Sequence, residues 1–113
     1  MVAMLSEMEF IQAYEAVYEK LPVPEEIEEV CGTRPHVARR YIKQYQVYKF
    51  IGTYKKENAY SPSYRDIAEH LSISKTTISN LIYRLLIEGY VDYMPDIART
   101  LRVIEHPTLS LEG

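Results

Sequence analysis

Short polar side chains recur at helical spacing between Lys75 and Glu88. On a helical wheel the apolar residues of this stretch share one side. The opposite side carries Thr76, Ser79, Asn80 and Tyr83. An amide such as that of Asn80 can pair with adenine through two hydrogen bonds, and Thr76 can contact a base edge through its hydroxyl or methyl group. Solvated helix faces usually carry glutamate and lysine, but this face has no acid before Glu88. The pattern therefore favours base contacts in duplex DNA over a merely solvated surface.

A second group of side chains is suited to phosphate oxygens. Its members are basic, or lie in the first turn of an expected helix, where free N–H groups attract anions. They are Ser63, Tyr64, Arg65, Lys75, Thr77 and Arg84. Two further arginines, Arg99 and Arg102, lie in or beside an expected hairpin, from which they could reach the flanking backbone or the minor groove. Exposed arginines on hairpins are common, so their role is left open.

Two helices joined by a tight turn would position these side chains. Ser63 and Asp66 form a capping-box-like pair before a helix over 64–71, and Ser74 caps the helix over 75–88. The small residue needed where two such helices cross is Ala68. The apolar positions of the two inner faces are filled by Ile67, Leu71, Ile73, Ile78 and Leu81. Ser72 stands in the turn where glycine is favoured, because one residue there is left-handed. This spacing predicts a helix-turn-helix.

A small hairpin is expected directly after the second helix. Gly89 closes that helix, and strand-forming residues over 90–93 and 100–104 flank a turn that contains Pro95 and Asp96. A hairpin in this place converts the helix-turn-helix into a winged helix.

The segment from Gln46 to Ile104 resembles the DNA-binding domain of the LexA repressor family. The resemblance rests on the Ser-Pro-Ser start, the Ile-Ala core of the first motif helix, the Leu-x-x-x-Gly-x-Val end of the second, and the strand LRVI. It implies a winged helix-turn-helix with its second helix in the major groove. LexA proteins continue into a serine–lysine self-cleaving peptidase, for which 113 residues leave no room, so self-cleavage is not implied. Their wing is glycine-rich, whereas residues 95–99 here read Pro-Asp-Ile-Ala-Arg.

Two helices are expected before this segment, and a third, long helix leads into it. Ser6 and Glu9 form a capping box for the first, and prolines at 22 and 24 separate it from a short second helix that Gly32 ends. The inward residues expected from these two helices are Phe10, Tyr14, Val17, Ile27 and Val30. One long helix, from Arg34 to Asn58, is apolar on more than one side, so we expect it to be covered on two sides.

The N-terminal region has two interpretations. Ile27, Cys31, Thr33, Val37 and Tyr41 repeat the spacing of the motif residues, with one residue missing in the turn. This region would then be a degenerate helix-turn-helix with an outward basic face of Arg34, His36, Arg39, Arg40 and Lys43. The favoured alternative is a helical extension used for packing or dimerisation. In either case we expect a mainly α fold with a hairpin wing, divided into an extension (1–35), a winged helix-turn-helix (36–104) and a tail (105–113).

Charge is unevenly distributed along the chain. Residues 1–33 hold one basic and eight acidic residues, whereas residues 34–113 hold twelve basic and eight acidic ones, so only the second part suits nucleic acid. With one cysteine no internal disulfide can form, and a reducing compartment is the simplest interpretation. No secretory signal or apolar run long enough to cross a membrane is evident, and the three histidines lack metal-ligand spacing.

The expected function is a non-enzymatic one, sequence-specific binding to double-stranded DNA. A cytoplasmic, nucleoid-associated transcriptional regulator is favoured, above all a repressor that acts as a homodimer without cofactor or metal. A replication or plasmid-maintenance initiator is a second possibility. A third is a protein-interaction module whose acidic N-terminal region binds a basic partner.

Overall fold

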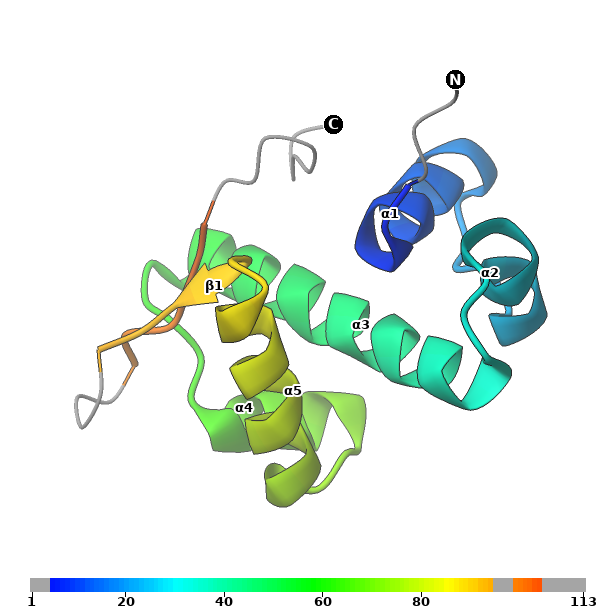
Figure 1. Ribbon diagram of the computed structural model, residues 1–113. Helices are drawn as coiled ribbons and strands as arrows, with labels where there is room; N and C mark the ends of the chain where they lie inside the picture. The colour runs from blue at the N-terminus through cyan, green and yellow to red at the C-terminus, as the bar shows by residue number, and fades with distance from the viewer. Residues whose placement is uncertain (1–4, 95–98, 105–113) are drawn as a thin grey trace.

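The computed structural model describes residues 5–94 and 99–104. Within these ranges, five helices precede a two-stranded hairpin (Figure 1). The helices are α1 (Glu7–Tyr18), α2 (Pro24–Cys31), α3 (Pro35–Asn58), α4 (Tyr64–Leu71) and α5 (Lys75–Ile87), and the strands are β1 (Val91–Asp92) and β2 (Arg102–Val103). The chain is thus mainly helical with a small wing, as predicted. Of the helices in the described ranges, none has the length and apolar character that crossing a membrane requires.

Side-chain caps set the starts of the helices that position the motif. Ser63 accepts from the Asp66 N–H (3.1 Å), and Asp66 accepts in return from the Ser63 N–H (2.9 Å). Ser74 accepts from the Thr77 N–H at 3.2 Å. Each cap satisfies N–H groups that have no partner within the helix. All of these caps were predicted, as was the reciprocal pair of Ser6 and Glu9 that begins α1.

Helix α3 is the central element of the fold. It runs without a break through the buried Gly52 and ends in the left-handed Ala59. Helices α1 and α2 pack against it, and so do α4, α5 and the hairpin (Figure 1). The long helix was predicted, with Arg34 now seen as its N-cap. One continuous hydrophobic core therefore joins the N-terminal helices to the helix-turn-helix.

The buried side of α1 differs from the expected one. The core residues are Met8 and Ile11, whereas Val17 is 71% exposed and Phe10 and Tyr14 are half-buried. The expected and the observed apolar residues form two neighbouring rows along the helix, offset by about one residue. Both rows have helical spacing, so only tertiary packing selects between them. In α2, Ile27 is buried as expected but Val30 is 48% exposed, so that part of the expectation is wrong.

The turn between α4 and α5 has the predicted form. Ser72 is left-handed (φ 55°, ψ 43°), and the Ile73 N–H donates to the Ala68 carbonyl at 3.1 Å. Ile67, Ile78 and Leu81 are buried between the two helices. These features make α4 and α5 a helix-turn-helix.

The turn between α2 and α3 corrects one expectation. It contains three residues, 32–34, as does the turn 72–74 between α4 and α5. No residue is missing. The fully buried residue that corresponds to Ile78 is Ala38, not the half-buried Val37.

The wing follows α5 at once. Helix α5 ends at Ile87 with Glu88 as its C-cap, and Gly89 has φ +82°, a conformation that glycine adopts without strain. Val91 pairs with Val103, and Asp92 pairs with Arg102, in antiparallel register. Residues 95–98 of the wing and the predicted tail lie outside the described residues.

Candidate nucleic-acid interface

Helix α5 presents the predicted polar face to solvent. Thr76, Ser79 and Asn80 are exposed, and Tyr83 is 61% exposed. The residues on its inner side are buried in the core: Ile78, Leu81, Ile82 and Leu85. Packing thus fixes the rotation of the helix and brings the four proposed base-contacting side chains together on one accessible face.

Proposed phosphate contacts lie at both ends of α5 and at the start of α4. Lys75 and Arg84 are exposed, as is Arg65 in the first turn of α4. Tyr64 is half-buried, and burial raises the pKa of its phenol. Thr77 accepts a hydrogen bond from the Ser74 hydroxyl at 2.9 Å, and Ser63 takes part in the α4 cap, so these two hydroxyls are already ordered.

A shallow groove of about 410 Å³ runs between α3 and α5. Its walls are Arg40, Thr77, Asn80, Leu81, Tyr83, Arg84 and Ile87. Arg40 therefore adjoins the polar face of α5, although the sequence placed it only on the N-terminal basic face. No local signal could reveal this, because the contact depends on how α3 crosses α5.

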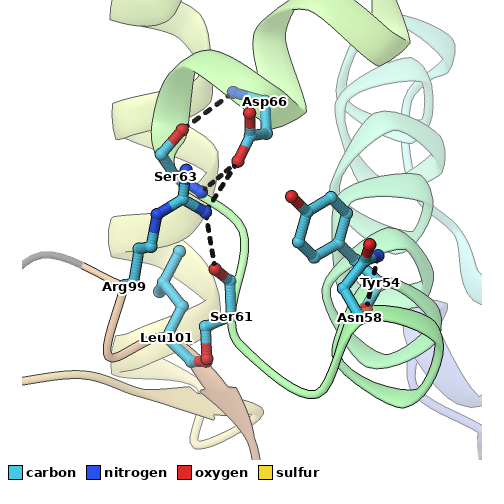
Figure 2. Close-up of polar contacts among 7 residues, drawn as sticks. All are labelled: Tyr54, Asn58, Ser61, Ser63, Asp66, Arg99 and Leu101. Atoms are coloured by element: carbon cyan, nitrogen blue, oxygen red, sulfur yellow. Dashed lines mark hydrogen bonds and ion pairs between the residues drawn. The ribbon is translucent and has the colours of Figure 1, made fainter.

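Arg99 is held against the start of α4. Figure 2 shows its side chain reaching back between Ser61 and Asp66. The guanidinium donates to the Asp66 carboxylate and to the Ser61 carbonyl, each at 3.1 Å, and lies 5.1 Å from the centre of the Tyr60 ring. The Ser61 hydroxyl donates to the Leu101 carbonyl, which adds a second link between this loop and the hairpin. Arg99 thus fastens the wing to the helix-turn-helix.

The second wing arginine is less constrained. Arg102 pairs with Asp92 across the hairpin at 3.0 Å, and the Arg102 side chain is 61% exposed. Exposed pairs of this kind contribute about 0–1 kcal/mol, so Arg102 can exchange its partner for a phosphate at little cost.

Comparison with known proteins decides the family. A family model described as LexA DNA binding domain matches residues 42–100, which is just over half of the chain. The chain belongs to the LexA DNA-binding domain family. The match begins four residues before the predicted start of the LexA-like segment, and it contains the whole helix-turn-helix. The resemblance inferred from the sequence is confirmed.

Two LexA repressors resemble this LexA-type segment. The LexA repressor of Thermosipho africanus (strain TCF52B) is 32% identical over 65 residues, which are 58% of this chain and 33% of that protein. The LexA repressor of Thermosipho melanesiensis (strain DSM 12029 / CIP 104789 / BI429) is 33% identical over 63 residues, 56% of this chain and 32% of that protein. The matched segment therefore spans about one third of each relative.

The sequence also raised Cys31 and the metal-ligating residue types as candidates for chemistry. Cys31 is a free, half-buried thiol whose pKa is raised by burial and by the nearby Glu7, which disfavours the reactive thiolate. Within the described ranges, no group of three or more His, Cys, Asp or Glu side chains is arranged to hold a metal ion.

Asp66 links the α4 cap to the wing of the LexA-type unit. Its pKa is lowered chiefly by the hydrogen bond from the Ser63 N–H, against the opposing effect of burial, and further by the Ser63 hydroxyl and Arg99. A lowered pKa in the folded chain means that the ionised carboxylate stabilises the fold. This stabilisation is present above the pKa of an unfolded aspartate, about 3.9, and is lost as the pH falls through the folded value.

We expect Asp66→Ala to lower the free energy of unfolding by about 1 kcal/mol at neutral pH, because the reciprocal cap loses its acceptor. The difference from the parent should shrink below about pH 4. Urea unfolding at several pH values measures both effects. Arg99→Ala serves as the comparison, because it leaves the cap intact but removes the ion pair, the hydrogen bond to the Ser61 carbonyl and the contact with the Tyr60 ring. An Asp66→Ala deficit that persists undiminished at pH 2–3 would contradict the assigned role of the carboxylate.

Proposed function

We propose that this chain binds double-stranded DNA sequence-specifically and regulates transcription, with α5 in the major groove. The observation that carries the proposal is the outward face of α5, which is exposed, polar and free of acid before Glu88. Base edges of the major groove present donors and acceptors that match such side chains. Membership of the LexA DNA-binding domain family supports a non-catalytic, DNA-binding role.

Each part of the interface has a proposed task. Asn80 and Thr76 read base edges, with Ser79 and Tyr83 beside them on the same face. Phosphates are bound by Arg65, Lys75, Arg84, Thr77 and the first turn of α4 at Ser63 and Tyr64. Arg102 reaches the flanking backbone from the wing, and Arg99 fixes the position of that wing through Asp66.

Repression is the favoured mode of regulation, since the two relatives are named repressors. We propose that the chain acts as a homodimer on paired half-sites, as helix-turn-helix regulators commonly do. Initiation of replication or plasmid maintenance uses similar scaffolds and remains the alternative within the DNA-binding class.

A protein partner is the competing proposal, and the surface of α2 favours it. Glu25, Glu28 and Glu29 are exposed on this one short helix. Such a surface suits a basic protein partner. If the chain acts only as an interaction module, it should bind no duplex DNA even at low salt.

Selection of bound sites from random duplex DNA, followed by two substitutions, tests the assigned roles. Asn80→Ala should cost about 1–3 kcal/mol on the selected site and relax the preference at one base pair. Lys75→Ala should weaken binding to all sequences about equally, because the lysine that is removed is proposed to contact only phosphate. If Asn80→Ala leaves the base preference unchanged, α5 does not read the DNA through this face.

A further inference from the structure

The backbone repeats itself at an interval of 40 residues. Helix α1 ends in the left-handed Glu19 (φ 58°, ψ 26°), and α3 ends in the left-handed Ala59 (φ 62°, ψ 9°). Helix α2 ends in Gly32 (φ 74°, ψ 14°), and α4 ends in Ser72 (φ 55°, ψ 43°). Glu19, Ala59 and Ser72 are not glycines, and such residues seldom adopt this conformation, so the matched pairs indicate a backbone repeat that the helix starts and the core can check.

The helix starts repeat at the same interval. Val23 before α2 (φ −83°, ψ 159°) matches Ser63 before α4 (φ −84°, ψ 166°). In each case the acid three residues later, Glu26 or Asp66, accepts from the N-cap N–H at 2.9 Å. The loop before each of these helices has the same length, as does the turn after it.

Core packing repeats as well. The ring pair of Phe10 and Tyr14, with centroids 5.8 Å apart, corresponds to the pair of Phe50 and Tyr54 at 5.5 Å. Three further pairs are fully buried at both positions: Ile11 and Ile51, Ile27 and Ile67, Ala38 and Ile78. The chain therefore contains two three-helix units, α1–α2–α3 and α3–α4–α5. Helix α3 takes the place of α5 in the first unit.

The outward face of α3 in the first unit is cationic. At the 40-residue interval, the positions proposed to read bases on α5 are matched on α3 by His36, Arg39, Arg40 and Lys43. His36, Arg39 and Lys43 are exposed. Arg40 is half-buried, and its guanidinium lies 5.0 Å from the centre of the Tyr41 ring. Within the described ranges, neither these two arginines nor Lys43 forms an ion pair. Their charge is therefore available to an anion.

This face adjoins the DNA-binding surface of the second unit. Arg40 lines the same groove as Asn80 and Tyr83, and Gln44, one turn further along α3, donates to Glu88 at 2.9 Å. A duplex in contact with α5 would therefore bring its sugar–phosphate backbone towards the N-terminal half of α3.

The first unit is not suited to enter a groove by itself. Glu25 occupies the position that corresponds to Arg65, where a phosphate would be met. Like charge at that position opposes docking of α2 on DNA. Lysine and arginine side chains that meet a duplex outside its grooves bind phosphate oxygens, and such contacts carry no direct sequence information.

Resting on the function proposed above, we propose that the N-terminal half of α3 is a second phosphate-binding surface on the same duplex. Arg39, Arg40 and Lys43 bind the backbone beside the site read by α5. They lengthen the bound segment and add affinity that does not depend on sequence. The first helical unit thus serves as a modified helix-turn-helix that clamps DNA through its third helix alone.

The test compares three single substitutions by the salt dependence of duplex binding. Arg39→Ala and Lys43→Ala should each reduce the slope of log affinity against log salt by about 0.9, the value for one lost phosphate contact, with the base preference unchanged. Lys20→Ala is the matched control. It removes one exposed cation from the loop between α1 and α2 and should leave the slope unaltered.

Varying the length of the duplex tests whether α3 and α5 bind the same DNA molecule or two different ones. Extending the flank of the selected site by about 10 bp, one helical turn, should strengthen binding by the parent more than by Arg39→Ala/Lys43→Ala. If both α3 variants keep the parent slope while Lys75→Ala loses about one, the second surface is refuted and the proposed function stands. A parent chain without salt-dependent duplex binding would overturn both.

Discussion

A fragment that begins at Arg34 should be markedly less stable than the whole chain, or should self-associate. Removal of residues 1–33 takes away α1 and α2, which cover α3 on the side away from the helix-turn-helix. Met8, Ile11 and Ile27 are almost completely buried there. Burial of each such side chain stabilises a fold by about 1.5–3 kcal/mol. Together they amount to a large share of the ~5–15 kcal/mol that stabilises a typical domain.

Polar contacts between α1 and α3 increase the stability that the fragment is expected to lose. Glu15 accepts from the Tyr45 hydroxyl at 2.7 Å and from Lys49 at 2.9 Å. Burial raises the pKa of Glu15, but the hydrogen bonds from Lys49 and Tyr45 outweigh it and lower the pKa overall. In the fragment, Tyr45 would lose both this partner and the helices that bury its ring.

Sedimentation and urea unfolding of the fragment measure this effect. Removal of residues 1–5 alone is the control, because that deletion spares the Ser6 cap and the five helices of the described ranges. The fragment also loses seven net negative charges, so any monomeric fraction should bind duplex DNA more tightly at low salt. A soluble fragment with the parent's oligomeric state, stability and DNA affinity would show that the N-terminal helices are a passive appendage.

Local signals explain why the helix-turn-helix could be predicted. The pairs of Ser6 with Glu9 and of Ser63 with Asp66 lie three residues apart, and each settles a helix start by its own hydrogen bonds. Ser72 and Gly89 mark turns through the backbone conformations they adopt. The exposed face of α5 followed from periodicity, since Thr76, Ser79 and Asn80 lie opposite the apolar residues that recur at helical spacing.

Features that depend on tertiary packing could not be predicted in the same way. Helix α1 is apolar on more than one side, so its spacing could not select Ile11 over Val17. Arg99 and Asp66 lie 33 residues apart in sequence, and nothing local indicates that they pair. The internal repeat was only partly visible because Ala38, a small residue, occupies the buried position of Ile78.

Salt dependence of duplex binding tests the central claim most directly. Four cationic groups of the winged helix-turn-helix are proposed to meet phosphates, and the three on α3 raise the number to seven, so log affinity should fall against log salt with a slope of roughly −4 to −6 per protomer. Between 50 and 200 mM salt this corresponds to a loss of affinity of roughly 250- to 4,000-fold. The measurement uses the whole chain and a duplex that carries the selected site, with a scrambled duplex as the control for sequence preference. A slope in this range, with tighter binding to the selected site, is the predicted result. A flat response, or no duplex binding at low salt, would contradict the DNA-binding function.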